Sequence, residues 1–366
     1  MSSSETLFAP LQFPNQRHAP NRIWLAPMTN RQSHFDGRLG DDEFHFLKAR
    51  AAGGFGVIET CATHISLDGQ GWENELGIYS DEMIPGWQKL ARGIQEQNSL
   101  LIAQIFHGGA RALPREEHGA PWSASPPMDG ESGSSFRAGT TEDIDAAIQG
   151  FRRAAMRIEE AGGDGVEIHG AHGYLLCQFL SKTWNRRDDH WGGDPLENRA
   201  RLTLEVIRAI REATSPGFIV GLRLSPENYG SFTGLDLDET LQVAQWACDE
   251  GADFIHISLW DGTQNTKKYP HIHPTSFFRE HLPKEVPLIT AGQIWAKEDA
   301  MAQLHLGADA VALGRSAITN PDWPQRVAQR GEEPHRPPLS AEALRDRALG
   351  DAFIDYMRRW DGFVLP

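Results

Sequence analysis

The stretch DGVEIHGAHGYL, residues 164–175, combines a short apolar strand with polar and aromatic side chains at the end of that strand. Side chains alternate in direction along a strand. Val166 and Ile168 should therefore face one side, while Glu167 and His169 face the other. The stretch predicts a buried strand whose carboxyl end presents functional groups.

Two imidazoles and a phenol follow in close succession: His169, His172 and Tyr174, on a turn opened by Gly170 and Gly173. Such a set can hold a polar oxygen and donate a proton. A purely structural histidine pair and a metal site remain open as alternatives. A metal would need a third ligand, and the spacing does not tie the candidates to the pair; they are His107, His256, His271 and His273. We favour a site for an organic substrate.

Strand and helix patterns alternate through most of the chain. Strands are expected at residues 22–28, 55–62, 99–107, 164–169, 218–226, 253–260, 287–294 and 309–318, and helices at 42–54, 84–98, 142–162, 194–214, 236–251, 274–282, 297–308 and from about 322. Eight such units predict a parallel sheet closed into a (β/α)8 TIM barrel. A doubly wound open sheet is the competing topology. It would require a glycine-rich dinucleotide turn after the first strand, where the sequence reads LAPMTNR.

Capping pairs mark the beginnings of two of these helices. Asp194 is expected to cap the helix at 194–214, with Pro195 in the first turn and Glu197 at the third position. Asp236 and Glu239 repeat the pattern before the next helix.

Two segments interrupt or precede the repeating pattern. Residues 7–20 contain three prolines and predict an N-terminal capping hairpin. Residues 108–140 are rich in Gly, Pro and Ser and too long for an ordinary connection. They predict a functional excursion after the third strand.

A C-terminal helical extension, residues 331–366 with a helix at 340–359, should follow a barrel that spans about residues 21–330. Trp360 and Phe363 in the extension are apolar enough to pack on the body or on a second copy of the chain. We expect a single domain over residues 1–366.

The composition limits the classes of partner. The chain has 366 residues and a net charge of −15, without a basic stripe, so nucleic acid is not an expected partner. Cys61, Cys177 and Cys248 are scattered and fit neither zinc nor iron–sulfur spacing. No leader peptide and no apolar run long enough to span a bilayer is apparent. We expect a cytoplasmic protein without a membrane partner.

The carboxyl ends of the strands should form the active site of such a barrel. The candidate residues there, in chain order, are Pro27, Met28, Thr29, Cys61, Gln104, Arg223, Trp260, Gly292, Gly314 and Arg315. Glycines after strands seven and eight let backbone N–H groups approach phosphate oxygens, and Arg315 adds a fork of donors. Although Gly292 and Gly314 could serve only as tight turns, the pair with Arg315 predicts a ligand that carries a phosphate.

Two polar side chains within strands have open interpretations. Arg223 could form a buried ion pair with Glu167 or Glu59, or it could provide a fixed positive charge beside a ligand that becomes negative during reaction. Gln104 offers a donor and an acceptor, as the edge of a polar heterocycle requires, but it could equally cap a backbone group.

The run HGAHGYLLCQFLSKTWNRRDDHWGGDPLENRARL, residues 169–202, closely resembles the old yellow enzyme family of FMN-dependent ene-reductases. The likeness covers roughly residues 6–330, because further family motifs follow in order: LFAPL, NRIWLAPMT (21–29), AQIFHGG (103–109), TAGQI (290–294) and ALGRSAI (312–318). The resemblance implies a TIM barrel with non-covalent FMN, with NADH or NADPH as reductant. The substrate would be a small molecule with an activated C=C bond, such as an α,β-unsaturated carbonyl compound.

The resemblance also implies a role for each candidate. Pro27, Met28, Thr29, Cys61 and Gln104 would line the flavin, Arg223 would sit by its N1 and O2, and Gly292, Gly314 and Arg315 would hold its phosphate. His169 and His172 would bind the substrate oxygen. Tyr174 would protonate the α-carbon while flavin N5 returns the hydride to the β-carbon.

The sequence departs from the family pattern in places that concern the pocket. Thr29 replaces a cysteine of some relatives, and Arg31 stands where some have a tyrosine that faces the substrate. Arg31 and Trp260 are therefore expected to shape substrate binding. Cys177 and Lys182 replace a common histidine and a common proline. The scattered cysteines and the length leave no room for the iron–sulfur and second dinucleotide domains of larger relatives, so the nicotinamide should visit the FMN site directly.

Two other functions remain as alternatives. A cofactor-free barrel lyase or isomerase could act on a phosphorylated metabolite, with His169 and Tyr174 as base and acid. A non-catalytic flavin-binding or small-ligand-binding protein is disfavoured by the intact His–His–Tyr set. The sequence does not indicate the natural substrate, the choice between NADH and NADPH, or the oligomeric state, although the aromatic tail would suit a homo-oligomer.

Overall fold

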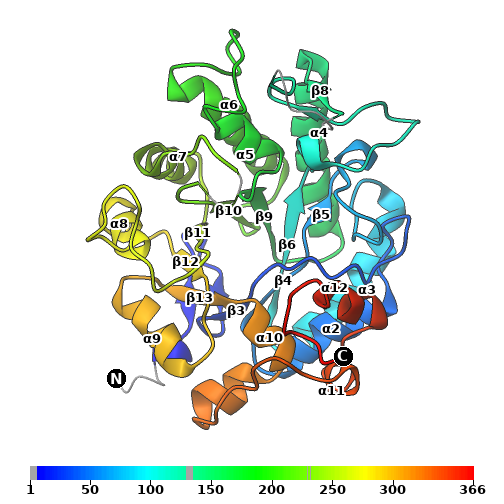
Figure 1. The fold of residues 1–366 in the computed structure, drawn as a ribbon, viewed down its shortest axis with the longest axis vertical. Helices are drawn as coiled ribbons and strands as arrows, with labels where there is room; N and C mark the ends of the chain where they lie inside the picture. Colours follow the sequence, from blue (N-terminus) through cyan, green and yellow to red (C-terminus); the bar gives the residue numbers. More distant parts are fainter. Residues whose placement is uncertain (1–5, 129–134, 229, 231) are drawn as a thin grey trace.

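A closed ring of parallel strands forms the centre of the molecule (Figure 1). The computed structural model describes residues 6–128, 135–228, 230 and 232–366. The sheet has the order β4-β3-β13-β12-β11-β10-β9-β6-β5, and a β4–β6 pairing closes eight of these strands into a barrel. The (β/α)8 barrel is confirmed, and the doubly wound alternative is wrong.

The barrel elements follow the predicted order with shorter strands. The strands are β3 (Ile23–Leu25), β4 (Val57–Glu59), β6 (Leu100–Phe106), β9 (Gly165–Gly170), β10 (Ile219–Leu224), β11 (Phe254–Ser258), β12 (Leu288–Ala291) and β13 (Ala310–Leu313). The helices that follow them are α2 (Asp41–Ala52), α3 (Ile84–Gln95), α4 (Thr141–Glu160), α6 (Leu196–Ala213), α7 (Leu237–Asp249), α8 (Pro274–His281), α9 (Lys297–His305) and α10 (Arg315–Thr319).

Shorter elements lie at the barrel ends and in the loops. They are β1 (Leu11–Gln12), β2 (His18–Ala19), β5 (Thr63–His64), β7 (Trp122–Ser123), β8 (Arg137–Ala138), α5 (Leu175–Leu180), α11 (Ala341–Arg345) and α12 (Asp351–Met357), the 3-10 turns η1 (Leu67–Gly69), η2 (Asp81–Met83) and η3 (Gly109–Arg111), and the π-helical turn η4 (Pro324–Gln329).

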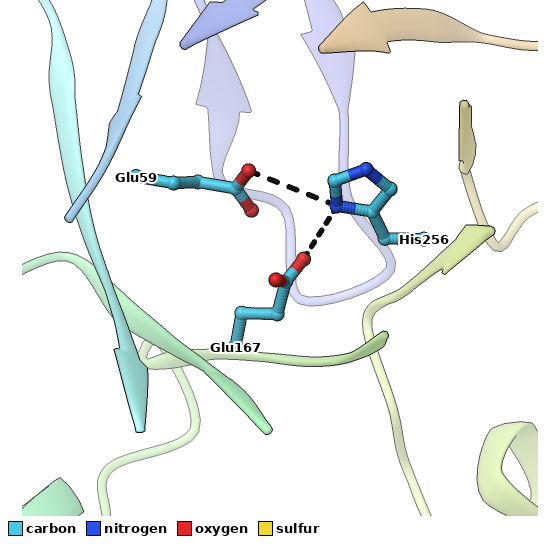
Figure 2. Close-up of side chains that lie close together, drawn as sticks. All are labelled: Glu59, Glu167 and His256. Atoms are coloured by element: carbon cyan, nitrogen blue, oxygen red, sulfur yellow. Dashed lines mark hydrogen bonds and ion pairs between the residues drawn. The ribbon is translucent and has the colours of Figure 1, made fainter. Parts of the chain in front are cut away.

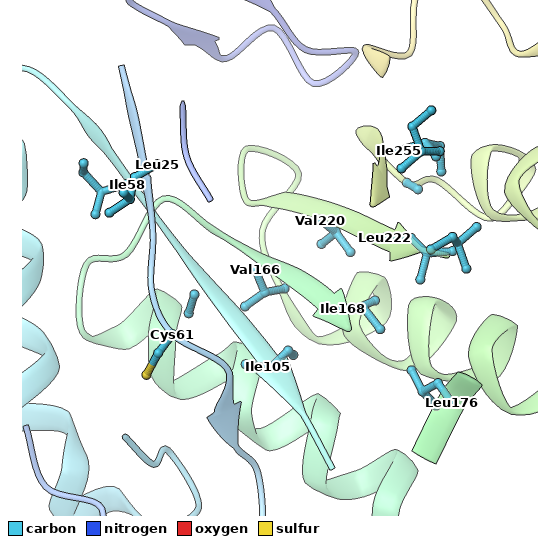
Figure 3. Packing of buried hydrophobic residues seen from close by; sticks show 14 of the residues in the cluster. Leu25, Ile58, Cys61, Ile105, Val166, Ile168, Leu176, Val220, Leu222 and Ile255 are labelled. Carbon is cyan, nitrogen blue, oxygen red and sulfur yellow. The ribbon is translucent and has the colours of Figure 1, made fainter. Parts of the chain in front are cut away.

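Strand β9 alternates as its sequence predicts. Val166 and Ile168 are fully buried in the apolar layer between the strands and the helices (Figure 3). Glu167 and His169 face the inside of the barrel, where Glu167 contacts His256 of β11. Burial of each aliphatic side chain in that layer contributes roughly 1.5–3 kcal/mol, which fixes the register of β9 and so the direction of its polar side chains.

The amino end of the barrel is closed by aromatic side chains and by the predicted hairpin. Strands β1 and β2 pair antiparallel, Leu11 opposite Ala19, and their buried residues join an apolar cluster with Trp24 and Phe254. The Trp24 and Phe254 rings meet edge to face with centroids 5.1 Å apart. A Cβ on Gly221 would lie 2.0 Å from the Phe254 ring, so only glycine fits at that position.

One of the two predicted helix starts differs from expectation, and the other is confirmed. Asp194 does not cap α6, because its carboxylate accepts a hydrogen bond from Arg199 Nη1 (2.8 Å), and the N-cap is Pro195. Asp236 does cap α7, through the backbone N–H groups of Asp238 and Glu239.

The last barrel strand and the C-terminal tail also differ from the sequence prediction. The strand predicted over 309–318 ends at Leu313, since the chain turns at Gly314 (φ −96°, ψ −99°) and continues as α10. The helix predicted over 340–359 is two short helices, α11 and α12. Ala348, with φ 60°, lies between them, and the N–H of Gly350 donates to Gln32 Oε1 (2.7 Å). The tail therefore bends to pack on the barrel near the start of α2.

The excursion after β6 packs at the carboxyl end of the barrel. Trp122 of β7 is buried, contacts the His107 ring at a centroid distance of 5.1 Å and donates to Asp68 Oδ2 (3.1 Å). Strands β7 and β8 pair with each other. Residues 129–134 of the predicted excursion lie outside the described residues.

Candidate functional site

The two histidines and the tyrosine predicted from the sequence lie together where β9 ends. The His169 and His172 ring centroids are 4.9 Å apart, and those of His169 and Tyr174 are 5.2 Å apart. His172 has φ 60°, and its N–H donates to Ser225 Oγ (3.1 Å), so the turn is held in a conformation that few non-glycine residues adopt. The Phe106 ring packs edge-on against Tyr174 at 5.0 Å and supports it.

The protonation states suit neutral hydrogen bonding and proton donation. Burial lowers the pKa of His169 well below its usual value, and the neighbouring positive groups, including Arg223, lower it further. The pKa of His172 is lowered by the same causes. Burial raises the pKa of Tyr174. At neutral pH the imidazoles are therefore uncharged and the phenol holds its proton.

Ser258, at the end of β11, connects His172 to Arg223. Its Oγ lies 2.7 Å from His172 Nε2 and accepts a hydrogen bond from Arg223 Nη2 at 3.1 Å. His169 Nδ1 and Arg223 Nε are buried without a hydrogen-bond partner among the described residues. Two buried nitrogens at this end of the barrel thus keep unused hydrogen-bonding capacity, as a site for a polar ligand requires.

A buried polar cluster lies beneath this site, inside the barrel. Glu59 of β4, Glu167 of β9 and His256 of β11 point toward one another from three strands (Figure 2). His256 Nδ1 lies 2.6 Å from Glu167 Oε2 and 3.7 Å from Glu59 Oε2. Arg223 Nη1 lies 4.0 Å from Glu167 Oε1, and Gln104 Nε2 donates to the same oxygen at 2.6 Å. The buried ion pair proposed for Arg223 therefore exists.

The two carboxyl groups of this cluster differ in charge. Burial raises the pKa of Glu59 well above its usual value, and the charge of Glu167 raises it further, so Glu59 is neutral at pH 7. Burial also raises the pKa of Glu167, but its contacts with His256 and Arg223 outweigh that effect, and the net shift is downward. A single negative charge on Glu167 thus balances Arg223 inside the barrel.

A cavity opens above Arg223 at the carboxyl ends of the strands. Eight of the predicted site residues line it: Pro27, Met28, Thr29, Arg223, Trp260, Gly292, Gly314 and Arg315. Aromatic and apolar side chains of the C-terminal tail complete its wall: Phe353, Tyr356, Met357 and Trp360. Phe363, which was predicted with Trp360 to pack on the body or on a second copy of the chain, is buried.

Two predicted flavin contacts lie outside this cavity. Cys61 does not line it, because its thiol donates to Glu43 Oε1 of α2 at 3.0 Å and lies in the layer between strands and helices (Figure 3). Gln104 does not line it either, because its amide is used inside the barrel by Glu167. Cys61 lies beyond the end of β4 with its thiol turned toward α2, whereas Gln104 points into the barrel interior, where Glu167 holds its amide.

The cavity has the donor set that FMN requires. At one end Gly292 (φ 150°) and Gly314 bring backbone close to the space beside Arg315, and a Cβ on Gly292 would lie 2.6 Å from Leu259 O. At the other end the unpartnered Arg223 Nε supplies positive charge. A phosphate-binding end and a cationic end joined by an apolar wall fit a flavin mononucleotide.

A second cavity, of about 330 Å³, adjoins the first and is lined by Tyr174 and Arg31. Thr29 and Tyr356 line both cavities and so mark their boundary. Trp260, predicted together with Arg31 to shape substrate binding, lines the first cavity and is 55% exposed. A molecule in the second cavity would therefore touch Tyr174 and a ligand of the first cavity together.

Three of the four histidines considered as third metal ligands have other partners. His107 Nε2 lies 3.3 Å from Asp68 Oδ2, His273 Nε2 lies 2.9 Å from Gly262 O, and His256 belongs to the interior cluster. His271 lies in the loop before α8 and is exposed. Within the described ranges, the residues whose ligand atoms could share a metal ion are Glu59, Glu167 and His256, and neither His169 nor His172 is among them.

Sequence reasoning missed several residues of the site. Ser258 could have been found, since it lies two positions after His256 on the same strand and so faces the same side. The spacing of Phe353, Tyr356 and Trp360 indicates one face of a helix. Arg111 of η3 follows the third strand, in a segment without periodicity, and no local signal identifies its place beside Tyr174.

A family model described as "NADH:flavin oxidoreductase / NADH oxidase family" matches residues 6–333. The chain is 35% identical over 340 residues to the probable NADH-dependent flavin oxidoreductase YqiG of Bacillus subtilis, covering 89% of each chain. Other relatives are named NADPH dehydrogenases.

Solved structures agree with these matches. Morphinone reductase is 29% identical and superimposes with a TM-score of 0.81 over 92% of both chains. An old yellow enzyme homologue from Zymomonas mobilis is 28% identical, with a TM-score of 0.79 over 92% of this chain and 96% of the other. Among the helices of the described chain, none has the length and apolar character needed to cross a lipid bilayer.

Proposed function

The chain belongs to the NADH:flavin oxidoreductase / NADH oxidase family, and on that basis we propose that it reduces the activated C=C bond of α,β-unsaturated carbonyl and related compounds. It is a flavin oxidoreductase that binds FMN and uses NADH or NADPH, as its relatives do. The observation that supports the finer proposal is that two neutral imidazoles pack with a protonated phenol, Tyr174, which lines the second of two adjoining cavities.

The flavin cavity would hold the cofactor through groups at its two ends. Gly292, Gly314 and Arg315 would bind the phosphate, and Arg223 would lie beside the polar edge of the ring system. FMN, when bound there, would supply the hydride chemistry that connects NAD(P)H with the β-carbon of the acceptor. Arg223, held by Glu167 and Ser258, supplies a fixed positive charge for the negative charge that develops on the reduced ring.

The acceptor would be polarised and protonated by the chain itself. His169 and His172 would donate hydrogen bonds to its carbonyl oxygen and stabilise the negative charge that develops there. His169 Nδ1 is buried and unpartnered, which supports this role. Tyr174, which keeps its proton at neutral pH, would donate it to the α-carbon. The hydride and this proton together complete the reduction of the double bond.

A two-step anaerobic experiment tests the proposal. The purified protein should show flavin absorbance, lose it on addition of NADH or NADPH, and regain it on addition of 2-cyclohexen-1-one. Tyr174→Phe should still be bleached, but the return of colour should slow by roughly 10²- to 10⁴-fold, the usual contribution of a general acid.

Tyr79→Phe is the matched control, because the Tyr79 hydroxyl bonds Asp36 O at 2.8 Å, outside both cavities. The rate of bleaching and the rate at which colour returns should both equal those of the wild type. A colourless protein that FMN cannot reconstitute, or turnover without flavin as a cofactor-free lyase would show, would contradict the proposal. If colour returned at the wild-type rate in Tyr174→Phe, Tyr174 would not be the proton donor.

A further inference from the structure

Three arginines and one acidic side chain line the second cavity, in a chain whose net charge is −15. Arg31 comes from the loop after β3, Arg111 from η3, and Arg359 from the end of α12. Segments far apart in the sequence thus direct positive charge to one place, beside Tyr174. The acid is Glu73, so the lining has a net positive charge.

The existing contacts of these arginines leave them able to bind an anion. Arg31 Nη2 meets Glu73 Oε2 only at 3.4 Å, and the Glu73 side chain is 62% exposed. Such an exposed pair contributes about 0–1 kcal/mol, so a ligand carboxylate can compete with it. The Arg359 guanidinium lies 5.4 Å from the centre of the Tyr356 ring.

Arg111 ties the positive charge to the reaction site. Its Nη1 donates to His172 O at 2.7 Å, and its guanidinium lies 4.7 Å from the centre of the Tyr174 ring. The carboxyl group of Glu75 lies behind the cavity wall, where it accepts hydrogen bonds from the backbone of Gly71 and Trp72. Burial raises its pKa well above the usual value, which disfavours a negative charge there.

We propose that the acceptor reduced at this site carries a carboxylate on or near its double bond, and that Arg31, Arg111 and Arg359 bind that carboxylate in the second cavity. This inference rests on the function proposed above and narrows its substrate class. NAD(P)H also carries anionic groups, but a ribose separates its diphosphate from the reactive ring. A group held by Arg111 lies next to Tyr174, which fits a carboxylate attached directly to the alkene.

A matched pair of acceptors tests the proposal: (E)-4-oxopent-2-enoate and its methyl ester, which share the ketone-activated double bond and differ in charge. The wild type should prefer the acid in kcat/KM. Arg359→Gln should lower the acid-to-ester ratio by about fivefold to tenfold, the loss expected for a charge-assisted hydrogen bond at a partly exposed site. Arg358→Gln is the control, because Arg358 pairs with Asp355 and does not line the cavity. Its ratio should match that of the wild type.

Binding without turnover gives an independent measurement. Calorimetry should show that the saturated product 4-oxopentanoate binds the wild type and the Arg358→Gln protein equally, more weakly to Arg359→Gln, and more weakly at high salt. An acid-to-ester ratio of kcat/KM that is the same in the wild type and in both variants would overturn the carboxylate proposal while leaving the ene-reductase function intact. Failure to reduce either acceptor would overturn the function itself. A raised KM for NADH with an unchanged acid-to-ester ratio would assign the arginines to the diphosphate of the reductant and overturn the proposal.

Discussion

The two ends of the barrel are built from the same strands but from opposite kinds of side chain. The amino end is an apolar cluster under a hairpin, with Trp24 and Phe254 in edge contact. The carboxyl end carries the polar site, where the non-glycine residues Arg31 (57°), His172 (60°) and Gln293 (56°) have positive φ; at the amino end, within the described residues, positive φ in non-glycine residues occurs only in connections, at Gln16 (68°) in the hairpin turn and Asn98 (59°) before β6. Unfavourable backbone conformations of this kind cost roughly 1–3 kcal/mol each. The comparison indicates that one end supplies the stability with which the other holds its reactive geometry.

Between the two ends lies a layer with features of both. The cluster of Glu59, Glu167 and His256 is as buried as the aromatic layer, yet it is polar and contacts Arg223 of the site. Burial of charge is costly unless the charges are paired. We therefore expect loss of the negative charge in this layer to affect both stability and activity, whereas changes at either end should affect one of them.

The largest effect on stability should come from the amino end. Phe254→Ala removes a fully buried ring that contacts Trp24 and Phe13 and fills the space over Gly221. It should lower the free energy of unfolding by about 3–5 kcal/mol, the usual cost of a large cavity in a core. Urea unfolding measures this loss. The KM for the acceptor, measured where the variant is still folded, should not change.

Phe35→Ala provides the comparison for that variant, since Phe35 is 63% exposed. Its free energy of unfolding should stay within about 0.5 kcal/mol of the wild type. If Phe254→Ala is as stable as Phe35→Ala, or if it changes the acceptor KM, the division of labour between the two ends is wrong.

The middle layer offers a sharper contrast between two equally buried carboxyl groups. Glu167→Gln removes the negative charge that pairs with Arg223 and His256, and should cost about 3 kcal/mol of stability, because a buried positive charge loses its partner. Glu59→Gln replaces a carboxyl group whose raised pKa already keeps it neutral, and should cost less than about 1 kcal/mol. Urea unfolding of both variants at pH 7 measures the difference.

Activity should follow the same order as stability in this layer. Glu167→Gln should slow reduction by NADH, because Arg223 loses one of the groups that hold it in place, and Glu59→Gln should not. Equal stability losses in the two variants would mean that the negative charge is shared between the carboxyl groups instead of residing on Glu167.

The sequence was sufficient for those features that depend on local periodicity. Val166 and Ile168 alternate with Glu167 and His169, and that alternation alone predicts which side chains face the barrel interior. The order of strand–helix units predicts the closed barrel in the same way, and the cluster of His169, His172 and Tyr174 follows from their positions at the end of one strand.

Features that depend on contacts between distant segments could not be predicted from local periodicity. Arg111, Tyr356 and Arg359 reach the site because η3 and α12 pack against the carboxyl end, and no pattern in their own sequence specifies that packing. Cys61 was assigned to the cavity from its place after a strand. Its direction is decided instead by a hydrogen bond to Glu43 of α2, a partner that periodicity does not reveal.

The smallest predicted effect is a loss of stability at acidic pH, and it arises from a histidine at the carboxyl end of the barrel. His64 of β5 is fully buried, stacks on Tyr79 at 5.3 Å and lies 3.8 Å from Glu75, a carboxyl group whose pKa burial raises well above its usual value. Burial, with a contribution from Arg115, lowers the pKa of His64 to about 3, from 6.5 in the unfolded chain. Above pH 6.5 the imidazole is neutral in both states and contributes no pH dependence. Below that value the unfolded chain binds a proton that the folded protein cannot accept, so stability falls as the pH falls.

Acidification from pH 7 to 5.5 should therefore cost the wild type about 1 kcal/mol through His64, with further losses from His169 and His172, whose pKa values are also lowered. His64→Gln should lose about 1 kcal/mol less than the wild type over this range, measured by urea unfolding at both pH values. His305→Gln, at an exposed position, should follow the wild type. If His64→Gln loses as much stability on acidification as the wild type, the acid sensitivity of the fold does not arise from this buried imidazole, and the carboxyl end is less specialised than the comparison requires.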